Sequence, residues 1–334
     1  MSYNSREVLW LLVGAGDIAR KRVAHCLNAV PRCRLVAVCD PDRERAESVA
    51  QLFGCPEVYT DYGSALANTG ANAVYVATPA YLHAGQAALA LEAGKHVLVE
   101  KPLGVDEADA GIAVTAAAGK KLRAGCAYFR RFSARYRHLK SVLENGDLGR
   151  IVLVRMSYVS WFNPDSGEGR SWRVRKACSG GGPLADMGSH MFDLLIGLFG
   201  LPSHVFARAQ TLVQPYEVED SASVMLRLEN GSIATGSFHW NSRAWSHRLE
   251  VIGTQGKVVW DPFDGNPVWL STGSDARELD LPNAGNVHMP LVEDFAQAVL
   301  DGRDPGVTLS EAAKTNRLLD AVYRSATSGA EVAV

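Results

Sequence analysis

The sequence predicts an α/β protein with two domains, the first built on a parallel sheet and the second an α+β domain with an open, largely antiparallel sheet. In residues 1–127, apolar runs typical of buried parallel strands alternate with segments of helical period. From about residue 128 the strands instead alternate apolar and polar residues. A chain of 334 residues can form two cores of ordinary size, so we expect domains at 1–127 and 128–334, with the last helix free to pack back on the first.

The elements of the first domain follow one another as strand and helix. Such alternation produces a parallel sheet with helices on both faces, connected by right-handed crossovers. The expected strands are residues 8–13, 35–39, 73–77, 96–99 and about 122–127, and the expected helices are residues 18–30, about 43–53, about 82–93 and about 107–118.

In the second domain, Glu229-Asn230-Gly231-Ser232 separates two alternating runs, which is typical of a β-hairpin. A few helices should accompany the open sheet. The expected strands are residues 151–156, 222–228, 233–240, 248–253 and 257–260, and the expected helices are residues 133–143, 292–300 and 310–325.

Composition limits the class of partner. With 34 basic and 36 acidic residues, the chain lacks the basic excess of a nucleic-acid-binding protein, and a small, weakly charged ligand is expected. Its six cysteines include no CxxC pair, which indicates reduced thiols in a cytoplasmic protein. The apolar run at 8–16 is too short to cross a bilayer, so no membrane association is expected.

A glycine-rich turn joins the first strand to the first helix. Gly14-Ala15-Gly16-Asp17-Ile18-Ala19 fits G-x-G-x-x-A, the pattern in which the backbone approaches a pyrophosphate and a helix N-terminus points at it. Gly14, Gly16, Asp17 and Ile18 are therefore predicted to bind a dinucleotide. The alternative is an ordinary glycine turn between a strand and a helix.

The strand ends that follow would complete a Rossmann nucleotide site. Asp40 ends the second strand, where a carboxylate can accept hydrogen bonds from the ribose hydroxyls of NAD and would repel the 2′-phosphate of NADP. NADP remains possible because Arg43 and Arg45 lie just downstream. Thr78 and Pro79 follow the strand at 73–77 and are predicted to bind the cofactor, as is His83, although His83 could simply satisfy the next helix.

Two residues supply the chemistry that alcohol oxidation needs. Removing a hydride from a secondary alcohol also requires a base for the hydroxyl proton and a donor that stabilises the oxygen. His190 can accept the proton, and Lys101, after the strand at 96–99, can stabilise the oxygen with its ammonium group. Lys101 could alternatively be a surface lysine.

His190 belongs to the segment Gly180-Gly181-Gly182-Pro183-Leu184-Ala185-Asp186-Met187-Gly188-Ser189-His190. The glycines and Pro183 suit a tight loop and a first helical turn, after which Asp186, His190 and Asp193 would share one helix face. An ordinary buried polar pair of Asp186 and His190 is an open alternative. A metal site is a weaker one, because a third ligand is not obvious, and no metal is predicted.

Two further groups of side chains could contact a substrate. Trp172 and Arg173 precede the glycine run and could form a wall and a donor for a polyhydroxylated ligand, although aromatic residues in a sheet domain are more often core. The basic cluster Arg130, Arg131, Arg135 and Arg137 could hold a phosphate, but a solvated helix face is the simpler interpretation.

Together these motifs resemble the glucose-fructose oxidoreductase, inositol dehydrogenase and rhizopine-catabolism family, called Gfo/Idh/MocA. The resemblance implies a Rossmann domain followed by an α/β domain whose open sheet often forms a dimer or tetramer interface, with sugars, inositols and related polyols as substrates. It covers Gly14 to Ala19, Asp40, Ala77-Thr78-Pro79 with His83, Ala93 to Val97, Glu100-Lys101-Pro102, Arg131-Phe132, Trp172-Arg173, Gly180 to Asp193 and Ala321 to Ala326.

By position, the resemblance gives Lys101 as the lysine of the family's EKP motif, beside Glu100 in the cofactor site, Asp186 as a substrate-contacting acid and His190 as the acid/base. Around Gly125-Cys126-Ala127-Tyr128 the chain lacks a polar residue often found near the nicotinamide.

The resulting expectation is an NAD(P)-dependent oxidoreductase of sugars, cyclitols or related polyols, forming a homodimer or homotetramer. An NAD-dependent glycoside hydrolase that oxidises its substrate transiently is an alternative. A non-catalytic dinucleotide-binding sensor is another, which the presence of Lys101, Asp186 and His190 disfavours. The substrate itself depends on loops such as 160–178 and 240–247, whose geometry the sequence does not predict.

Overall fold

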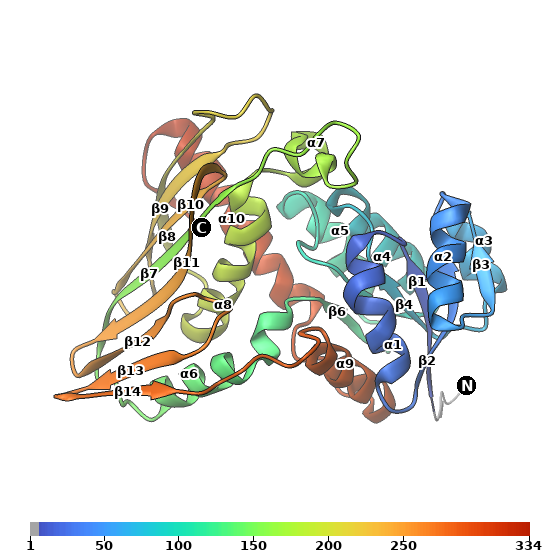
Figure 1. Ribbon diagram of the computed structural model, residues 1–334, viewed down its shortest axis with the longest axis horizontal. Coiled ribbons are helices and arrows are strands. Elements are labelled where there is room, and N and C mark those ends of the chain that lie inside the picture. The colour runs from blue at the N-terminus through green and yellow to red at the C-terminus, as the bar shows by residue number, and fades with distance from the viewer. Residues whose placement is uncertain (1–6) are drawn as a thin grey trace. The chain divides into compact units, whose positions relative to one another are not determined.

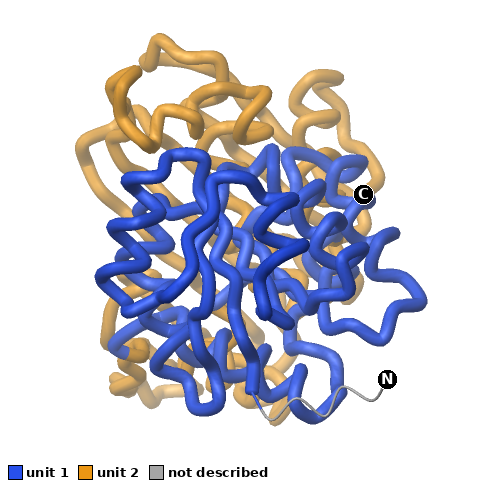
Figure 2. The backbone as a smooth tube through the Cα atoms, turned by 90° about the vertical axis from the view of Figure 1, so that its right-hand side faces the viewer, with its two compact units in different colours: residues 1–129, 285–313 blue, residues 130–284, 314–334 orange. Residues whose placement is uncertain are grey.

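The computed structural model describes residues 7–334 in two compact units, which Figure 2 colours separately. Unit 1 takes in the chain up to residue 129 and residues 285–313, and unit 2 consists of residues 130–284 and 314–334. The first division falls close to the boundary predicted at 127–128. Residues 285–313, by contrast, were expected in the second domain and belong to unit 1.

Unit 1 contains a six-stranded parallel sheet in the order β3-β2-β1-β4-β5-β6. The strand order reverses between β1 and β4, and ligands of open α/β sheets bind at the carboxyl ends of strands beside such a reversal. The predicted strands are confirmed, and the short β3 is an addition. The bounds are β1 (Val8–Val13), β2 (Cys33–Cys39), β3 (Glu57–Tyr59), β4 (Ala73–Val76), β5 (His96–Val99) and β6 (Ala124–Cys126).

The helices of unit 1 begin and end at local signals. The side chain of Asp42 accepts a hydrogen bond from the backbone N–H of Arg45 and caps α2, and Gly54 ends that helix with a left-handed φ of 66°. The helix expected at 18–30 opens as a π-helical turn, Ala19–Val23. The bounds are α1 (Ala24–Ala29), α2 (Arg43–Phe53), α3 (Tyr62–Asn68), α4 (His83–Glu92), α5 (Glu107–Ala117) and α9 (Met289–Asp301), with a 3-10 turn at Ala80–Leu82.

Unit 2 contains a nine-stranded sheet in the order β14-β13-β12-β11-β7-β10-β9-β8-β15. Neighbouring strands are antiparallel except β7 and β10, which are parallel, so the predicted, largely antiparallel sheet is confirmed. The bounds are β7 (Ile151–Trp161), β8 (His204–Gln210), β9 (Ser221–Arg227), β10 (Ile233–His239), β11 (Asn241–Gly253), β12 (Gly256–Trp260), β13 (Val268–Thr272), β14 (Asp275–Leu279) and β15 (Val332–Ala333).

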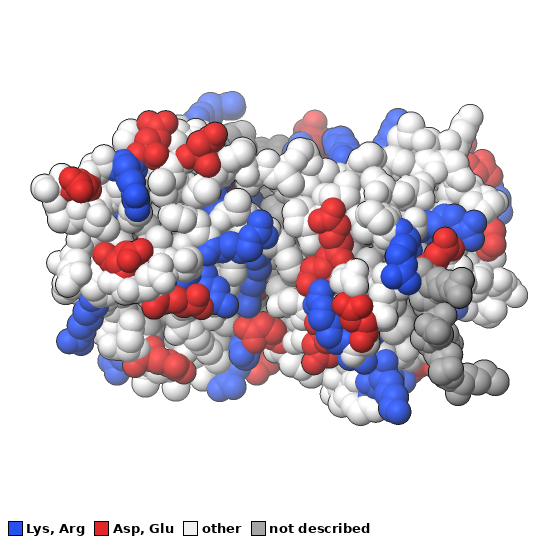
Figure 3. Space-filling view, turned by 90° about the horizontal axis from the view of Figure 1, so that it is seen from below, with Lys and Arg blue, Asp and Glu red and all other residues white. Residues whose placement is uncertain are grey.

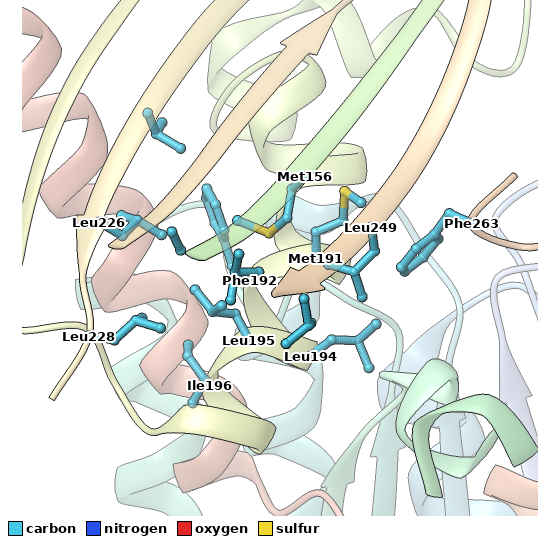
Figure 4. Close-up of a cluster of buried hydrophobic side chains, with 14 of the residues drawn as sticks. Met156, Met191, Phe192, Leu194, Leu195, Ile196, Leu226, Leu228, Leu249 and Phe263 are labelled. Atoms are coloured by element: carbon cyan, nitrogen blue, oxygen red, sulfur yellow. The ribbon is translucent and has the colours of Figure 1, made fainter. Parts of the chain in front are cut away.

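Helices cover one face of this sheet. Figure 1 shows α6 (Ala134–Glu144), α8 (Ser189–Phe199) and α10 (Leu309–Ser328) along the same side, and the unit boundary after residue 313 falls within α10. Alternate strand residues, such as Val224 and Leu226 of β9, point to these helices and are buried. Figure 4 shows the resulting core, in which Phe192 of α8 lies among Met156, Leu195 and Leu226. A short helix, α7 (Lys176–Ser179), and a 3-10 turn, Ser171–Val174, lie before the glycine run.

The core of unit 2 should be sensitive to loss of Phe192. Its ring meets that of Phe238 edge to face, with centroids 5.6 Å apart, and the side chain is fully buried. We expect Phe192→Ala to lower the free energy of unfolding by about 3–5 kcal/mol, because it leaves a cavity. Denaturant unfolding measures the loss. Leu212→Ala, at an exposed site, should cost less than about 0.5 kcal/mol, and equal losses in both variants would refute this view of the core.

Candidate functional site

The glycine turn after β1 lies directly against the end of β4. Gly14 has a φ of +90°, and a Cβ there would come within 2.8 Å of the carbonyl carbon of Ala77 and 2.9 Å of the nitrogen of Thr78. Gly16 differs, because a Cβ at that position would meet nothing within 4 Å. Gly14 is therefore required by the fold, whereas Gly16 leaves open space in front of the first helical turn, where a pyrophosphate can approach the backbone. These residues fit a dinucleotide.

Asp40 holds the same turn. Its Oδ2 accepts a hydrogen bond from the backbone N–H of Ala15 at 2.7 Å, and its Oδ1 accepts one from Asp42 at 2.9 Å. The carboxylate thus stands beside the glycine turn at the carboxyl end of β2. Arg43 and Arg45, considered above as phosphate ligands, pair with Glu47 and Asp42 on the exposed side of α2.

His83 connects the loops that follow β4 and β5. Its Nε2 lies 2.7 Å from the carbonyl oxygen of Thr78 and its Nδ1 lies 2.7 Å from that of Pro102. The ring is 1% exposed, and burial lowers its pKa. His83 therefore fixes the loop of Thr78 and Pro79 against the Glu100-Lys101-Pro102 segment.

Glu100 forms a buried polar cluster behind Lys101. Its Oε1 accepts a hydrogen bond from the hydroxyl of Tyr75 at 2.9 Å and lies 3.3 Å from Nε2 of His288, while Oε2 accepts the backbone N–H of Lys101 at 3.3 Å. Burial raises the pKa of Glu100, but the contacts with His288, Tyr75 and Lys101 outweigh it, and the pKa lies below its ordinary value. Sequence analysis missed Tyr75 and His288, and no local pattern marks His288, which arrives from residues 285–313.

In unit 2, Asp186 and His190 occupy different turns. Asp186 lies in a π-helical turn, Leu184–Gly188, and His190 lies at the start of α8. The Asp186 side chain is partly exposed, with Oδ1 3.9 Å from Nε of Arg173, whose guanidinium stacks 4.8 Å above the ring of Trp172. His190 is buried. Trp172, Arg173 and Asp186, each predicted to contact the substrate, therefore lie together.

Asp193, expected on the same helix face, has a structural role. Oxygen atoms of its buried carboxylate lie 2.8–2.9 Å from the guanidinium of Arg131, which also donates to the Asp193 carbonyl. Asp193 therefore anchors Arg131 in the interior of unit 2, and Asp186 lies in the π-helical turn before α8.

The basic cluster is neither a phosphate site nor a solvated face. Arg130 binds Asp264 through two nitrogens, and Arg135 is buried and donates to the carbonyl oxygens of Leu281 and Phe263. Only Arg137 is exposed, and it donates to the carbonyl of Phe132. Both earlier interpretations were wrong for Arg130, Arg131 and Arg135, because their partners come from distant segments.

Tyr158 of β7 lies near Asp186. Burial raises the pKa of its phenol, and the negative charge of Asp186 raises it further.

Several classes of site are not found in the part of the chain that the structure describes. Among residues 7–334 there is no group of three or more His, Cys, Asp or Glu side chains arranged for a metal ion. In the same range, no helix is long and apolar enough to span a bilayer. On the face shown in Figure 3, basic and acidic side chains are interspersed.

A parallel sheet with a strand-order reversal, a glycine turn and an acidic residue after β2 defines a dinucleotide-binding protein. Comparison with known families identifies it further. Residues 8–128 match the family described as "Oxidoreductase family, NAD-binding Rossmann fold", and residues 136–259 match the "GFO/IDH/MocA C-terminal domain". The chain belongs to the Gfo/Idh/MocA family of oxidoreductases, as its motifs indicated.

Individual relatives are distant but extend over most of the chain. The levoglucosan dehydrogenase of Pseudarthrobacter phenanthrenivorans is 28% identical over 275 residues, covering 75% of this chain and 70% of its own. The scyllo-inositol 2-dehydrogenase (NAD(+)) of Bacillus subtilis is 26% identical over 314 residues, covering 90% and 89%. A solved structure of levoglucosan dehydrogenase with NADH, 24% identical, superimposes with a TM-score of 0.89 over 98% of this chain and 99% of its own, which shows the same fold.

The two glycines of the turn should respond differently to substitution. We expect Gly14→Ala to destabilise the protein by about 1–3 kcal/mol even without a ligand, because of its φ and the contact with Ala77. Gly16→Ala should leave unfolding within about 0.5 kcal/mol of the wild type but weaken NAD binding at least tenfold, because a methyl group fills the open space. Calorimetric titration and denaturation measure both effects, and wild-type affinity in Gly16→Ala would exclude this turn as the pyrophosphate site.

Proposed function

We propose that the protein transfers a hydride between a CH–OH carbon of a sugar, cyclitol or related polyol, or its keto form, and a nicotinamide dinucleotide, preferably NAD. The observation that carries the proposal is the presence of Lys101, Asp186 and His190 in a chain of this family whose glycine turn leaves room for a pyrophosphate.

The proposed chemistry divides the leaving hydrogen atoms of an alcohol between two acceptors. His190 accepts the hydroxyl proton, and the Lys101 ammonium donates to the oxygen as negative charge develops on it. Bound NAD supplies the acceptor for the hydride and its electron pair. The products are a carbonyl compound, a proton on His190 and the reduced dinucleotide, and the reverse reaction uses the same groups.

The cofactor preference follows from Asp40. Its carboxylate is fixed by the backbone N–H groups of Ala15 and Asp42, so it cannot easily turn away from a ribose bound at the end of β2. The hydroxyls of NAD can donate to it, whereas the 2′-phosphate of NADP would be repelled. Arg43 and Arg45 are engaged with acidic partners of their own.

The substrate class follows from the residues around Asp186. A partly exposed carboxylate accepts hydrogen bonds from ring hydroxyls, and the neighbouring Arg173 donates to them. The face of Trp172 can pack against the C–H groups of a sugar or cyclitol ring. Relatives named for levoglucosan and scyllo-inositol support this class.

A panel of monosaccharides, sugar acids and cyclitols, supplied with NAD or NADP, tests the function through the absorbance of reduced nicotinamide. With the substrate so found, we expect Lys101→Ala to lower kcat by about 100-fold or more, as loss of an oxyanion donor does in comparable enzymes, with the cofactor Kd changed less than about threefold. His190→Ala should also lower kcat and remove a limb of its pH profile.

Lys121→Ala, which removes an exposed lysine elsewhere in unit 1, is the matched control and should behave as the wild type. Wild-type turnover in Lys101→Ala would remove that residue from the mechanism. Sugar release from glycosides without net cofactor reduction would favour the hydrolase alternative, and cofactor binding without turnover of any substrate would favour the sensor.

We further propose that two copies of the chain associate through the face of the unit 2 sheet opposite α6, α8 and α10. Met225 of β9 and Ile233 of β10 are exposed on that face and are diagonal neighbours, since Met225 pairs with Thr235 and Ile233 with Arg227. Trp269 of β13 is exposed as well. Exposed apolar side chains gathered on one sheet face are typical of an interaction surface.

Light scattering after size-exclusion chromatography tests this surface. We expect the wild type to be a dimer or tetramer and Met225→Glu/Ile233→Glu to have a smaller mass, because charges would be buried without partners. Leu89→Glu, at an exposed apolar site of α4, should keep the wild-type mass. A monomeric wild type at micromolar concentration, or an unchanged double variant, would contradict the proposal.

The state of the cysteines supports a cytoplasmic location. All six have free thiols, and burial raises the pKa of Cys26 to about 12 and that of Cys39 to about 11. A reducing compartment maintains such thiols, so we propose the cytoplasm.

A further inference from the structure

The turn that carries Asp186 is held by residues from two other segments. Gly182 and Pro183 precede the turn, Leu184 is its first residue, and Pro183 provides no side-chain cap. The Glu219 carboxylate takes that role. Its Oε2 accepts the backbone N–H of Gly182 at 3.0 Å, and its Oε1 accepts that of Leu184 at 3.3 Å.

Tyr323 of α10 completes the arrangement. Its hydroxyl donates to Oε1 of Glu219 at 3.0 Å. Glu219 is 9% exposed, and its burial raises its pKa, against which the hydrogen bonds from Gly182, Tyr323 and Leu184 act. A carboxylate at the beginning of a helical turn also interacts favourably with the backbone dipoles there.

The glycines of this run are explained by the same contacts. A Cβ at Gly181 would lie 1.7 Å from the Tyr323 hydroxyl, and a Cβ at Gly182 would lie 2.0 Å from the carbonyl oxygen of Glu219. The backbone can thus approach Glu219 and Tyr323 only because both positions lack side chains. The glutamate and the tyrosine come from separate segments of unit 2, residues 130–284 and 314–334.

A short path of hydrogen bonds leads from Glu219 to the proposed substrate contact. The N–H of Gly182 donates to Glu219, and the carbonyl oxygen of Gly182 accepts the N–H of Asp186 at 3.0 Å. The carbonyl of Asp186 in turn accepts the hydroxyl of Ser189, next to His190. A displacement of Gly182 would therefore move the backbone of Asp186 directly.

We propose that Glu219 and Tyr323 are positioning residues, which set the turn so that Asp186 presents its side chain to the substrate in one geometry. This inference rests on the proposed function, because it gives the turn a catalytic purpose. Neither residue touches the reacting atoms. Small errors in placement are enough to slow an enzyme, since a shift of about 1 Å can cost about 100-fold.

The test compares Glu219→Gln, Tyr323→Phe and Glu217→Gln with the wild type. Glu217→Gln is the matched control, because Glu217 lines the same cavity of about 270 Å³ as Glu219 and Tyr323 but accepts the N–H of Lys176 instead of contacting the turn. We expect kcat to fall about tenfold in Glu219→Gln and about threefold in Tyr323→Phe, with the KM for NAD within about twofold. The control should equal the wild type.

Two measurements separate positioning from general stabilisation. In an Asp186→Asn background, Glu219→Gln should cost less than about twofold, because the residue that it positions is already impaired. Hydrogen exchange of the peptide over residues 180–190 should be faster in Glu219→Gln and Tyr323→Phe and unchanged in Glu217→Gln.

Wild-type kcat in Glu219→Gln, while Asp186→Asn is slow, would overturn the inference. So would an equal loss from Glu219→Gln in both backgrounds, which is the result expected of a purely structural residue. A wild-type kcat in Asp186→Asn would instead refute the proposed role of Asp186 and with it the catalytic purpose of the turn. In that case, faster exchange in Glu219→Gln would show only that Glu219 stabilises the turn.

Discussion

Both parts of the candidate site depend on glycines at which the backbone comes close to another segment. Gly14 places the dinucleotide turn against the backbone of Ala77 and Thr78, and Gly182 places the Asp186 turn against Glu219. A Cβ at either position would overlap backbone atoms of the facing segment, which could move only if a strand end shifted. The glycines therefore fix how closely each turn lies against its facing segment, and the turns determine where the functional side chains lie.

Buried carboxylates hold both turns in the same way. Asp40 accepts backbone N–H groups from Ala15 and Asp42, and Glu219 accepts those of Gly182 and Leu184. A carboxylate forms strong hydrogen bonds with backbone N–H groups that have no other acceptor, and its removal leaves these buried N–H groups without partners. Residues distant in the sequence thereby determine where the Gly16 and Asp186 backbones lie, which local propensity alone could not do.

Local patterns were sufficient to predict most elements. Helix α2 has both its cap, Asp42, and its terminal glycine, Gly54, in the sequence, and the short apolar run of β1, directly before a glycine turn, predicts a buried strand. Prediction failed where a distant partner decides the outcome. In the sequence, Arg131 has the pattern of a surface residue, and only the fold brings Asp193 beside it. His288 contacts Glu100 because residues 285–313 belong to unit 1, although they are distant from Glu100 in the sequence. The π-helical turn that contains Asp186 has no sequence period of its own and was not predicted.

The central claim is that a hydride leaves a CH–OH carbon of a polyol for the nicotinamide ring. The most direct measurement uses a substrate carrying deuterium at the oxidised carbon, followed by mass spectrometry of the recovered cofactor. The account predicts deuterium in the reduced nicotinamide and a slower kcat/KM for the labelled substrate. Turnover of the labelled substrate with no deuterium in the recovered dinucleotide and an unchanged kcat/KM would contradict it.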